Sequence, residues 1–130
     1  MLGVDPGTGK CGLALLDEQG QVTYRAVVAL ARLPEEVRKL AAQAPFARIA
    51  LGSRTGSQRV KAALESALPG VPIELVSEHR TTEQARRLYW GYHPPRGWRR
   101  LIPRGMLLAP EPVDAYAAEI LARRLREREA

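Results

Sequence analysis

The stretch GVDPGTGKCGLALLDEQG, residues 3–20, places the first acid of the chain directly after a short apolar run. Asp5 is followed by the turn sequence Pro6-Gly7-Thr8-Gly9, and residues 11–17 are again mostly apolar. This pattern predicts a strand over 1–5, a tight turn and a second strand over 11–17. Asp5 either only opens the turn, as Asp commonly does, or ends a strand that delivers a carboxylate to a reactive site. The rest of the chain has to decide between these interpretations.

Beyond this stretch the periodicity alternates between strand and helix. A third strand is predicted over 21–29, two further strands over 47–51 and 72–77, and helices over 34–43, 57–68, 81–90 and 111–126. Thr81-Thr82-Glu83-Gln84 is typical of a capping box with Thr81 as the N-cap. Residues 91–110 hold four of the ten prolines and are predicted to be loop.

The element order is therefore βββαβαβα. Strands joined by short turns are antiparallel neighbours, whereas strands that follow helical crossovers lie parallel to the first strand. We expect an α/β fold with a mixed five-stranded sheet flanked by helices. At 130 residues, the chain is expected to form a single domain over 1–130.

Composition narrows the class of protein. The hydrophobic fraction of 45% and the charged fraction of 26% are those of an ordinary globular protein. No apolar run approaches the ~18 residues of a membrane-spanning helix, and the first predicted strand leaves no room for a signal peptide. The single cysteine, Cys11, lies in an apolar run and is expected to be buried rather than nucleophilic. These features predict a cytoplasmic protein.

The net charge of +6 is concentrated in one segment. Residues 79–104 contain seven arginines and a single acid, Glu83, while bases and acids balance in the rest of the chain. A neutral body with one basic segment favours a polyanionic partner, such as a nucleic acid, on one face. A solvated basic loop is the alternative.

Acids are predicted to meet at one edge of the sheet. Asp5 and Glu78 follow parallel strands, whose carboxyl ends share an edge where ligands gather. Asp114 lies in the first turn of the last predicted helix, and Glu111 precedes it by three residues on the same helical face. Each acid also has a purely structural explanation: a turn for Asp5, a solvated strand end for Glu78 and the helix dipole for Glu111 and Asp114.

Taken together, the acids point to a cation. Carboxylates gathered at one edge raise one another's pKa unless a positive charge lies among them. Oxygen ligands without a His or Cys cluster suit Mg²⁺ or Mn²⁺. Two such ions, about 4 Å apart, can activate water and stabilise the leaving oxygen of a phosphodiester. An acidic metal site beside an arginine-rich segment is the arrangement that a nuclease needs.

Three motifs, in matching order over nearly the whole chain, resemble the YqgF/RuvX family. They are the apolar-Asp-Pro-Gly-Thr start, SEHRTT at residues 77–82 and VDAYAAEIL at residues 113–121. The family comprises RNase H-like nucleases related to the RuvC Holliday-junction resolvases. The resemblance implies an RNase H-like fold, with Asp5, Glu78 and Asp114 as catalytic, metal-binding acids. Family members are linked to resolution of branched DNA and to maturation of the 16S ribosomal RNA precursor.

The chain departs from the family pattern at two places. The family has Asp-Glu-Arg before the Thr-Thr pair, whereas this chain has Ser77-Glu78-His79. The loop after the fourth strand, usually Gly-Leu-Pro-like, is here GSRTGS at residues 52–57. Glu111 is a candidate to supply the missing negative charge as an additional metal ligand. His79 could assist proton transfer, although a lone His at a strand end is more often only solvated or packed.

Candidate nucleic-acid contacts come from three regions. The loop at 52–57 precedes a helix, whose N-terminus favours a phosphate, although Ser57 could equally be an N-cap. Residues 89–105 interleave four aromatics with four arginines, which suits stacking of unpaired bases beside neutralised phosphates. Trp90 is expected to pack into the core instead. The predicted contact residues are Lys10, Arg54, Ser57, Arg80, Arg96, Trp98, Arg99, Arg100 and Arg104.

The sequence therefore predicts a metal-dependent endonuclease acting on structured nucleic acid. An inactive nucleic-acid-binding module of the same fold is the main alternative, because the Ser77-Glu78-His79 departure touches the site. An Asp-x-Gly-Thr turn also opens the phosphate loop of actin-like and sugar-kinase-like ATPases, but these need two such domains and a second phosphate loop, for which 130 residues leave no room. Branched DNA and rRNA precursor both remain open as substrates. Resolution of a four-way junction would favour a homodimer, because two symmetric strands must be cut.

Overall fold

The structure is a computed structural model that describes residues 1–54, 56–101 and 112–129. In this part of the chain five strands form one sheet in the order β3-β2-β1-β4-β5. Their bounds are β1 Leu2–Asp5, β2 Lys10–Leu16, β3 Val22–Ala29, β4 Ile49–Gly52 and β5 Ile73–Val76. Strand β2 pairs antiparallel with β1 and β3, whereas β4 lies parallel to β1 and β5. The predicted mixed five-stranded sheet is confirmed.

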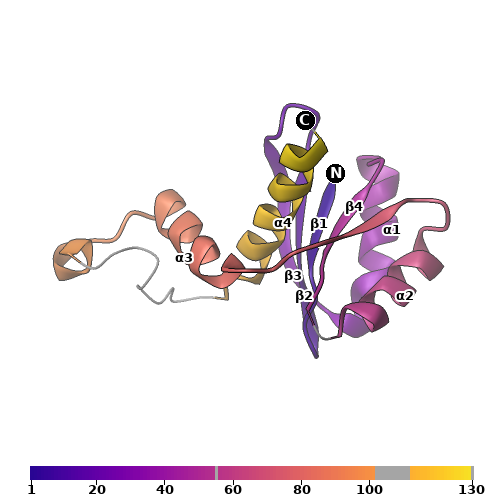
Figure 1. The fold of residues 1–130 in the computed structure, drawn as a ribbon, viewed down its shortest axis with the longest axis horizontal. Helices are drawn as coiled ribbons and strands as arrows, with labels where there is room; N and C mark the ends of the chain where they lie inside the picture. The colour runs from indigo at the N-terminus through magenta and orange to yellow at the C-terminus, as the bar shows by residue number, and fades with distance from the viewer. Residues whose placement is uncertain (55, 102–111, 130) are drawn as a thin grey trace.

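Helices cover both faces of this sheet (Figure 1). They are α1 Leu33–Gln43, α2 Ser57–Ala67, α3 Thr81–Tyr92 and α4 Asp114–Glu129, with short 3-10 helices η1 Leu30–Arg32 and η2 Gly97–Leu101. Helices α1 and α2 lie on one face and α4 on the other, with α3 packed beside α4 (Figure 1). Beyond α3, η2 projects away from the sheet (Figure 1). No helix in the described ranges is long and apolar enough to cross a membrane.

Both faces of β1 are covered, each by a different helix layer. Leu2 and Val4 are fully buried in a cluster with Leu33, Val37 and Leu64 of α1 and α2. On the opposite face, α4 approaches β2 so closely that a Cβ at Gly12 would collide with the carbonyl of Asp114. Glycine at this position therefore lets the first turn of α4 lie against the sheet, which sets the place of Asp114.

A buried carboxylate ties α4 to β3 and α3. Glu119 is 0% exposed and accepts hydrogen bonds from Arg25 Nε at 2.9 Å, Arg123 Nε at 3.0 Å and Tyr92 OH at 3.3 Å. The Arg25 guanidinium also lies 4.2 Å from the centroid of the Tyr92 ring. A carboxylate this deeply buried is tolerated only when it is paired and hydrogen-bonded. These contacts hold α3 against the body of the protein.

Several predicted details are confirmed and others are wrong. Cys11 is 0% exposed and Trp90 is 5% exposed, both buried as expected. Helix α4 begins at Asp114 rather than Glu111, because the helical hydrogen bonds start with Ala117 N–H donating to the Val113 carbonyl. The segment predicted as loop over 91–110 contains the end of α3 and all of η2.

The predicted capping box at the start of α3 is also wrong. The N-cap is Arg80, in the left-handed region at φ 60° and ψ 18°, and Thr81 is already the first helical residue. The Thr81 hydroxyl donates to the Glu78 carbonyl at 2.9 Å instead of accepting a bond from the helix. Strand β5 ends at Val76, so Glu78 lies in the turn two residues beyond the strand. This turn, rather than the strand itself, determines where Glu78 points.

Candidate functional site

Two predicted acids meet at the carboxyl edge of the parallel strands. Asp5 ends β1 and lies beside the end of β4, while Glu78 follows β5, the next strand along the sheet. Their side chains are only 7% and 8% exposed. The register of the three parallel strands brings their carboxyl ends to one edge, as the sequence predicts. Two largely buried carboxylates therefore share one small region.

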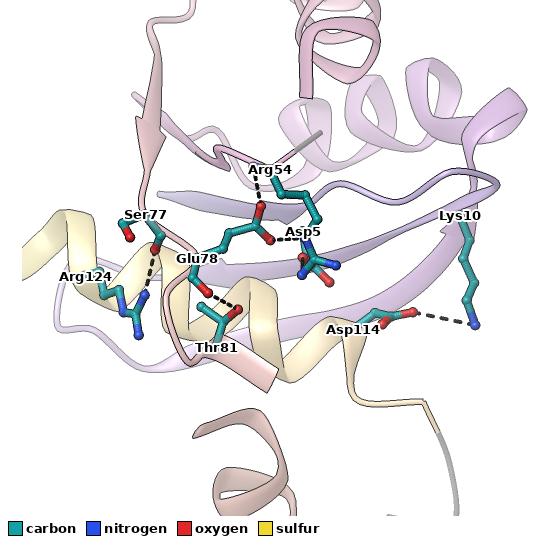
Figure 2. Close-up of polar contacts among 8 residues, drawn as sticks. All are labelled: Asp5, Lys10, Arg54, Ser77, Glu78, Thr81, Asp114 and Arg124. Carbon is teal, nitrogen blue, oxygen red and sulfur yellow. Dashed lines mark hydrogen bonds and ion pairs between the residues drawn. The ribbon is translucent and has the colours of Figure 1, made fainter. Parts of the chain in front are cut away.

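Arg54 lies between these two acids (Figure 2). Its Nε lies 2.9 Å from Glu78 Oε1 and its Nη2 lies 3.3 Å from Asp5 Oδ1. Its backbone N–H also donates to Glu78 Oε2 at 2.6 Å. The side chain of Arg54 is 47% exposed, so it remains in contact with solvent while its Nε and Nη2 bind the acids. The loop residue predicted to contact phosphate thus acts as a cation for the carboxylates.

The glycine that ends β4 makes room for Glu78. A Cβ at Gly52 would lie 2.7 Å from Glu78 Oε2 and 2.8 Å from Oε1, closer than real Cβ atoms approach. The Glu78 carboxylate therefore lies directly against the backbone of β4. The loop after this strand was noted as a departure from the YqgF/RuvX pattern. Nothing in the sequence, however, indicated that Gly52 leaves room for the carboxylate of Glu78.

The electrostatics of the pair are strongly perturbed. The pKa of Asp5 is raised from 3.8 to about 8, chiefly by burial and next by a hydrogen bond with the Glu78 side chain, while Arg54 acts in the opposite direction. The negative charges of Glu78 and Asp114 are smaller contributions to the same increase. Burial disfavours the charged form of Arg54, but Asp5 and Glu78 outweigh this effect and raise its pKa. One guanidinium does not fully compensate the acids, so the site favours additional positive charge or a proton.

Asp114 lies apart from this pair. It is the first residue of α4, its carboxylate is 32% exposed, and its Oδ2 lies 3.6 Å from Lys10 Nζ (Figure 2). Its charge still contributes to the raised pKa of Asp5. Within the described ranges, however, no three His, Cys, Asp or Glu side chains are close enough together to hold a metal ion. The structure thus brings Asp5 and Glu78 together, whereas Asp114 is paired with Lys10.

The donor set nonetheless fits a divalent cation of the hard type. Asp5 and Glu78 offer only oxygen atoms, they are desolvated, and both already coordinate one positive group, the Arg54 guanidinium. Oxygen ligands of this kind suit Mg²⁺ or Mn²⁺ rather than zinc. Asp114 could add a third oxygen ligand if its carboxylate gave up the contact with Lys10 and bound the ion instead.

The predicted nucleic-acid contacts divide into two groups. Lys10 and Arg54 are engaged with the acids, Arg80 is exposed in the turn beside Glu78, and Ser57 is buried at 6% exposure in the first turn of α2. Gly56 rather than Ser57 is the N-cap of that helix. The Ser57 N–H already donates to the Arg54 carbonyl at 3.0 Å, which weakens the prediction that this residue binds a phosphate.

Arg96 and Trp98 belong to the projecting region around η2. Both are exposed, Trp98 by 68%. They border a cleft of about 640 Å³, which is otherwise lined by Tyr89, Trp90, Tyr92, His93, Pro94 and Pro95. Figure 1 shows this region well away from the strand ends that carry the acids. The side chains of Arg99 and Arg100, and the residues Arg104 and Glu111, lie outside the described residues.

His79 is exposed in the turn after Glu78, with its backbone N–H donating to Ser77 Oγ at 3.3 Å. Arg124 of α4 also binds this turn, because it donates a hydrogen bond to the carbonyl of Ser77 at 2.6 Å. Nothing in the sequence pointed to Arg124, because its partner lies 47 residues away along the chain. Only an alignment of covarying positions or the fold itself could have found it.

The architecture defines a class of protein: an α/β domain with the RNase H-like fold. It is similar to the structure of RuvC from T. thermophilus in complex with a Holliday junction substrate, with a TM-score of 0.61 and 16% identity over 99% of this chain and 96% of that one. A second Thermus thermophilus RuvC structure matches with a TM-score of 0.57 and 18% identity over 99% and 95% of the two chains. No protein-family model matches the chain, and no curated protein is significantly similar to it in sequence. These similarities establish the fold.

Proposed function

We propose that this protein is a divalent-metal-dependent endonuclease that hydrolyses phosphodiester bonds in structured nucleic acid. The single observation that carries the proposal is the pair of buried carboxylates, Asp5 and Glu78, gathered around one positive charge at the carboxyl edge of an RNase H-like sheet. Fold similarity to RuvC, one of whose structures contains a Holliday junction, supports the same conclusion. Branched DNA is therefore the first substrate to test.

The acids would hold the metal. Asp5 and Glu78 would bind it at the strand ends, and Asp114 would complete the set from α4. A divalent ion at this position supplies Lewis-acid activation of water and neutralisation of charge on the scissile phosphate. Asp5, whose pKa of about 8 favours the protonated form in the metal-free protein, would release its proton when the ion binds.

Arg54 would then serve the substrate. Its guanidinium is half-exposed and is bound to the same carboxylates that the ion would occupy. Once the acids are neutralised by the metal, the fork of Arg54 donors is free to bind a phosphate oxygen, for which guanidinium geometry is well suited. Lys10 would be released from Asp114 in the same way and would add a second positive charge.

The basic segment would hold the nucleic acid at a distance from the cut. Arg80 is exposed in the turn two residues after Glu78, whereas Arg96 and Trp98 lie on the projecting region, where phosphate contacts and base stacking would anchor a long or branched substrate. We further propose membership of the YqgF/RuvX family, a cytoplasmic location and a homodimer for junction cutting. Processing of a 16S rRNA precursor is the alternative substrate that this family implies.

A second function has a specific observation in its favour. Arg54 binds both acids and Lys10 binds the third, so every predicted catalytic carboxylate already has a positive partner. A nucleic-acid-binding module that no longer needs a metal would have this arrangement.

One experiment separates the two functions. A four-way DNA junction and a 16S-precursor-like RNA are incubated with the protein in Mg²⁺, Mn²⁺ or EDTA, beside Asp5→Asn and the exposed control Glu65→Gln. Cleavage that requires metal, is lost in Asp5→Asn and is kept in Glu65→Gln would support the nuclease, and the substrate cut would identify its biology. Binding without cleavage in every metal would leave the binding module.

A further inference from the structure

The turn that carries Glu78 is held from outside by an arginine of another helix. Arg124 of α4 donates through Nη1 to the carbonyl of Ser77 at 2.6 Å and through Nη2 to the carbonyl of His79 at 2.6 Å. The same Nη2 lies 3.0 Å from Gln84 Oε1 on α3. The guanidinium thus binds the backbone carbonyls on both sides of Glu78. Figure 2 shows its bond to Ser77, with the Glu78 carboxylate directed toward Arg54 instead.

The remaining carbonyl of the turn is bound as well. The carbonyl of Glu78 accepts hydrogen bonds from the Thr81 hydroxyl at 2.9 Å and from the Thr81 N–H at 3.1 Å. Three successive carbonyls, those of residues 77, 78 and 79, therefore each have a defined donor. With its carbonyls fixed in this way, the peptide units around Glu78 have little freedom to rotate.

The backbone of this turn needs such support. Arg80 has a φ of 60°, and it is the one residue other than glycine with a positive φ in the part of the chain that the structure describes. The left-handed conformation costs a residue with a Cβ roughly 1–2 kcal/mol, so it persists only where surrounding contacts impose it. Two charge-assisted bonds from one planar guanidinium are strong contacts of this kind.

We propose that Arg124 is a positioning residue that sets the Glu78 carboxylate in place against Gly52, Arg54 and Asp5. It acts through the backbone carbonyls of the turn, and the proposal rests on the proposed function in that Glu78 is taken as a metal ligand. Outer partners that orient a metal ligand typically change metal affinity 10–100-fold, roughly, when they are removed.

A matched control lies on the same helix. Arg128 follows Arg124 by four residues and joins α4 to β5, with its Nη2 3.0 Å from Glu74 Oε2. It therefore provides a second arginine link from α4, but it binds the side chain of a strand residue and not the turn at 77–79. Arg128→Met therefore removes a comparable link without disturbing the Glu78 carbonyls.

The first measurement needs no metal. The Arg54 N–H donates to Glu78 Oε2 at 2.6 Å, so its amide proton resonance reports where the carboxylate lies. In metal-free protein, Glu78→Gln identifies the shift that is due to the carboxylate. Arg124→Met is expected to move this resonance in the same direction as Glu78→Gln, Arg124→Lys to move it less, and Arg128→Met to leave it unchanged.

The second measurement is the affinity for Mn²⁺, followed by the loss of the free-ion paramagnetic resonance signal. Arg124→Met is expected to weaken binding roughly tenfold and Arg124→Lys less, because an ammonium can reach a carbonyl but lacks the planar fork. Arg128→Met is expected to bind like the unaltered chain. Circular dichroism of each variant checks that it is folded.

The outcomes separate the two ideas. If Glu78→Gln abolishes Mn²⁺ binding but Arg124→Met changes neither the affinity nor the Arg54 resonance, the positioning role is wrong and the metal site stands. If Mn²⁺ fails to bind even the unaltered chain, the proposed function is wrong, and the resonance alone decides whether Arg124 positions Glu78. Equal effects of Arg124→Met and Arg128→Met would reduce Arg124 to a general link between helix and sheet.

Discussion

Replacement of Asp5 by Asn is expected to make the metal-free protein more stable at alkaline pH. Folding buries the Asp5 carboxyl beside Glu78 and raises its pKa from 3.8 to about 8, so the folded chain keeps a proton that the unfolded chain has lost. Between these two values, stability falls as pH rises, because the unfolded state binds fewer protons. The contribution of this proton is complete below the unfolded pKa and is lost as pH passes through the folded value.

The size of the effect follows from the two pKa values. One pKa unit corresponds to about 1.4 kcal/mol, so a shift from 3.8 to about 8 sets an upper limit of about 6 kcal/mol at pH 8. Local rearrangement around Arg54 reduces this, and we expect an observed difference of roughly 2–4 kcal/mol. Asn has the shape of protonated Asp, and its amide can donate to Glu78 as the protonated acid does.

The assay is urea unfolding of both proteins in EDTA at pH 5 and pH 8, with Glu65→Gln as an exposed-acid control. The unaltered chain should lose stability from pH 5 to pH 8, whereas Asp5→Asn should change much less and be the more stable protein at pH 8. Excess Mn²⁺ should then stabilise the unaltered chain but not Asp5→Asn, because an ion that binds only the folded state adds to its stability. If Asp5→Asn is the less stable protein at pH 8 in EDTA, the account of the site as an excess of buried negative charge is wrong.

Three further substitutions test the surroundings of the site. Gly52→Ala places a Cβ against the Glu78 carboxylate, which would have to move away and lose a hydrogen bond to Arg54. We expect a loss of about 1 kcal/mol in urea unfolding together with weaker Mn²⁺ binding. Gly91→Ala, where a Cβ meets nothing within 4 Å, should do neither. Arg54→Ala removes the guanidinium that competes with a metal ion for Asp5 and Glu78, so the affinity for Mn²⁺ should rise about tenfold. Binding of the four-way junction should weaken in the same variant. An unchanged Mn²⁺ affinity would argue against competition between Arg54 and the ion. Glu119→Ala leaves two partly exposed arginines and the Tyr92 hydroxyl without their buried partner and should cost about 1–3 kcal/mol. A loss below about 0.5 kcal/mol would show that this group does not hold α3 in place.

Much of the fold could be predicted from local sequence. Alternation of apolar residues, the turn after Asp5 and helical spacing identified the five strands and four α-helices of the described residues, because these signals depend only on neighbours along the chain. The parallel crossovers placed Asp5 and Glu78 at one edge, since strand direction follows from connection length. The aromatic and basic character of residues 89–105 could also be read from the sequence, because it depends on composition alone.

The partners of the acids were not visible in the sequence. Arg54 was recognised as a loop residue facing phosphate, yet the structure binds it to Asp5 and Glu78, across 49 and 24 residues of chain. Thr81 matched a capping pattern, but the left-handed Arg80 ends the turn one residue earlier and frees the Thr81 hydroxyl for the Glu78 carbonyl.

The sequence by itself thus determined the mixed five-stranded sheet, the directions of its strands and the edge at which Asp5 and Glu78 lie, whereas the order of the strands across the sheet came from the structure. Tertiary structure alone decided how those acids are paired: Arg54 binds two of them, Lys10 binds Asp114, and Arg124 binds the turn that carries Glu78. The physical reason is that the spacing of apolar and turn residues along the chain reports local conformation and burial. The pairing of charges depends instead on side chains that meet only after α4 packs onto the sheet beside the strand ends.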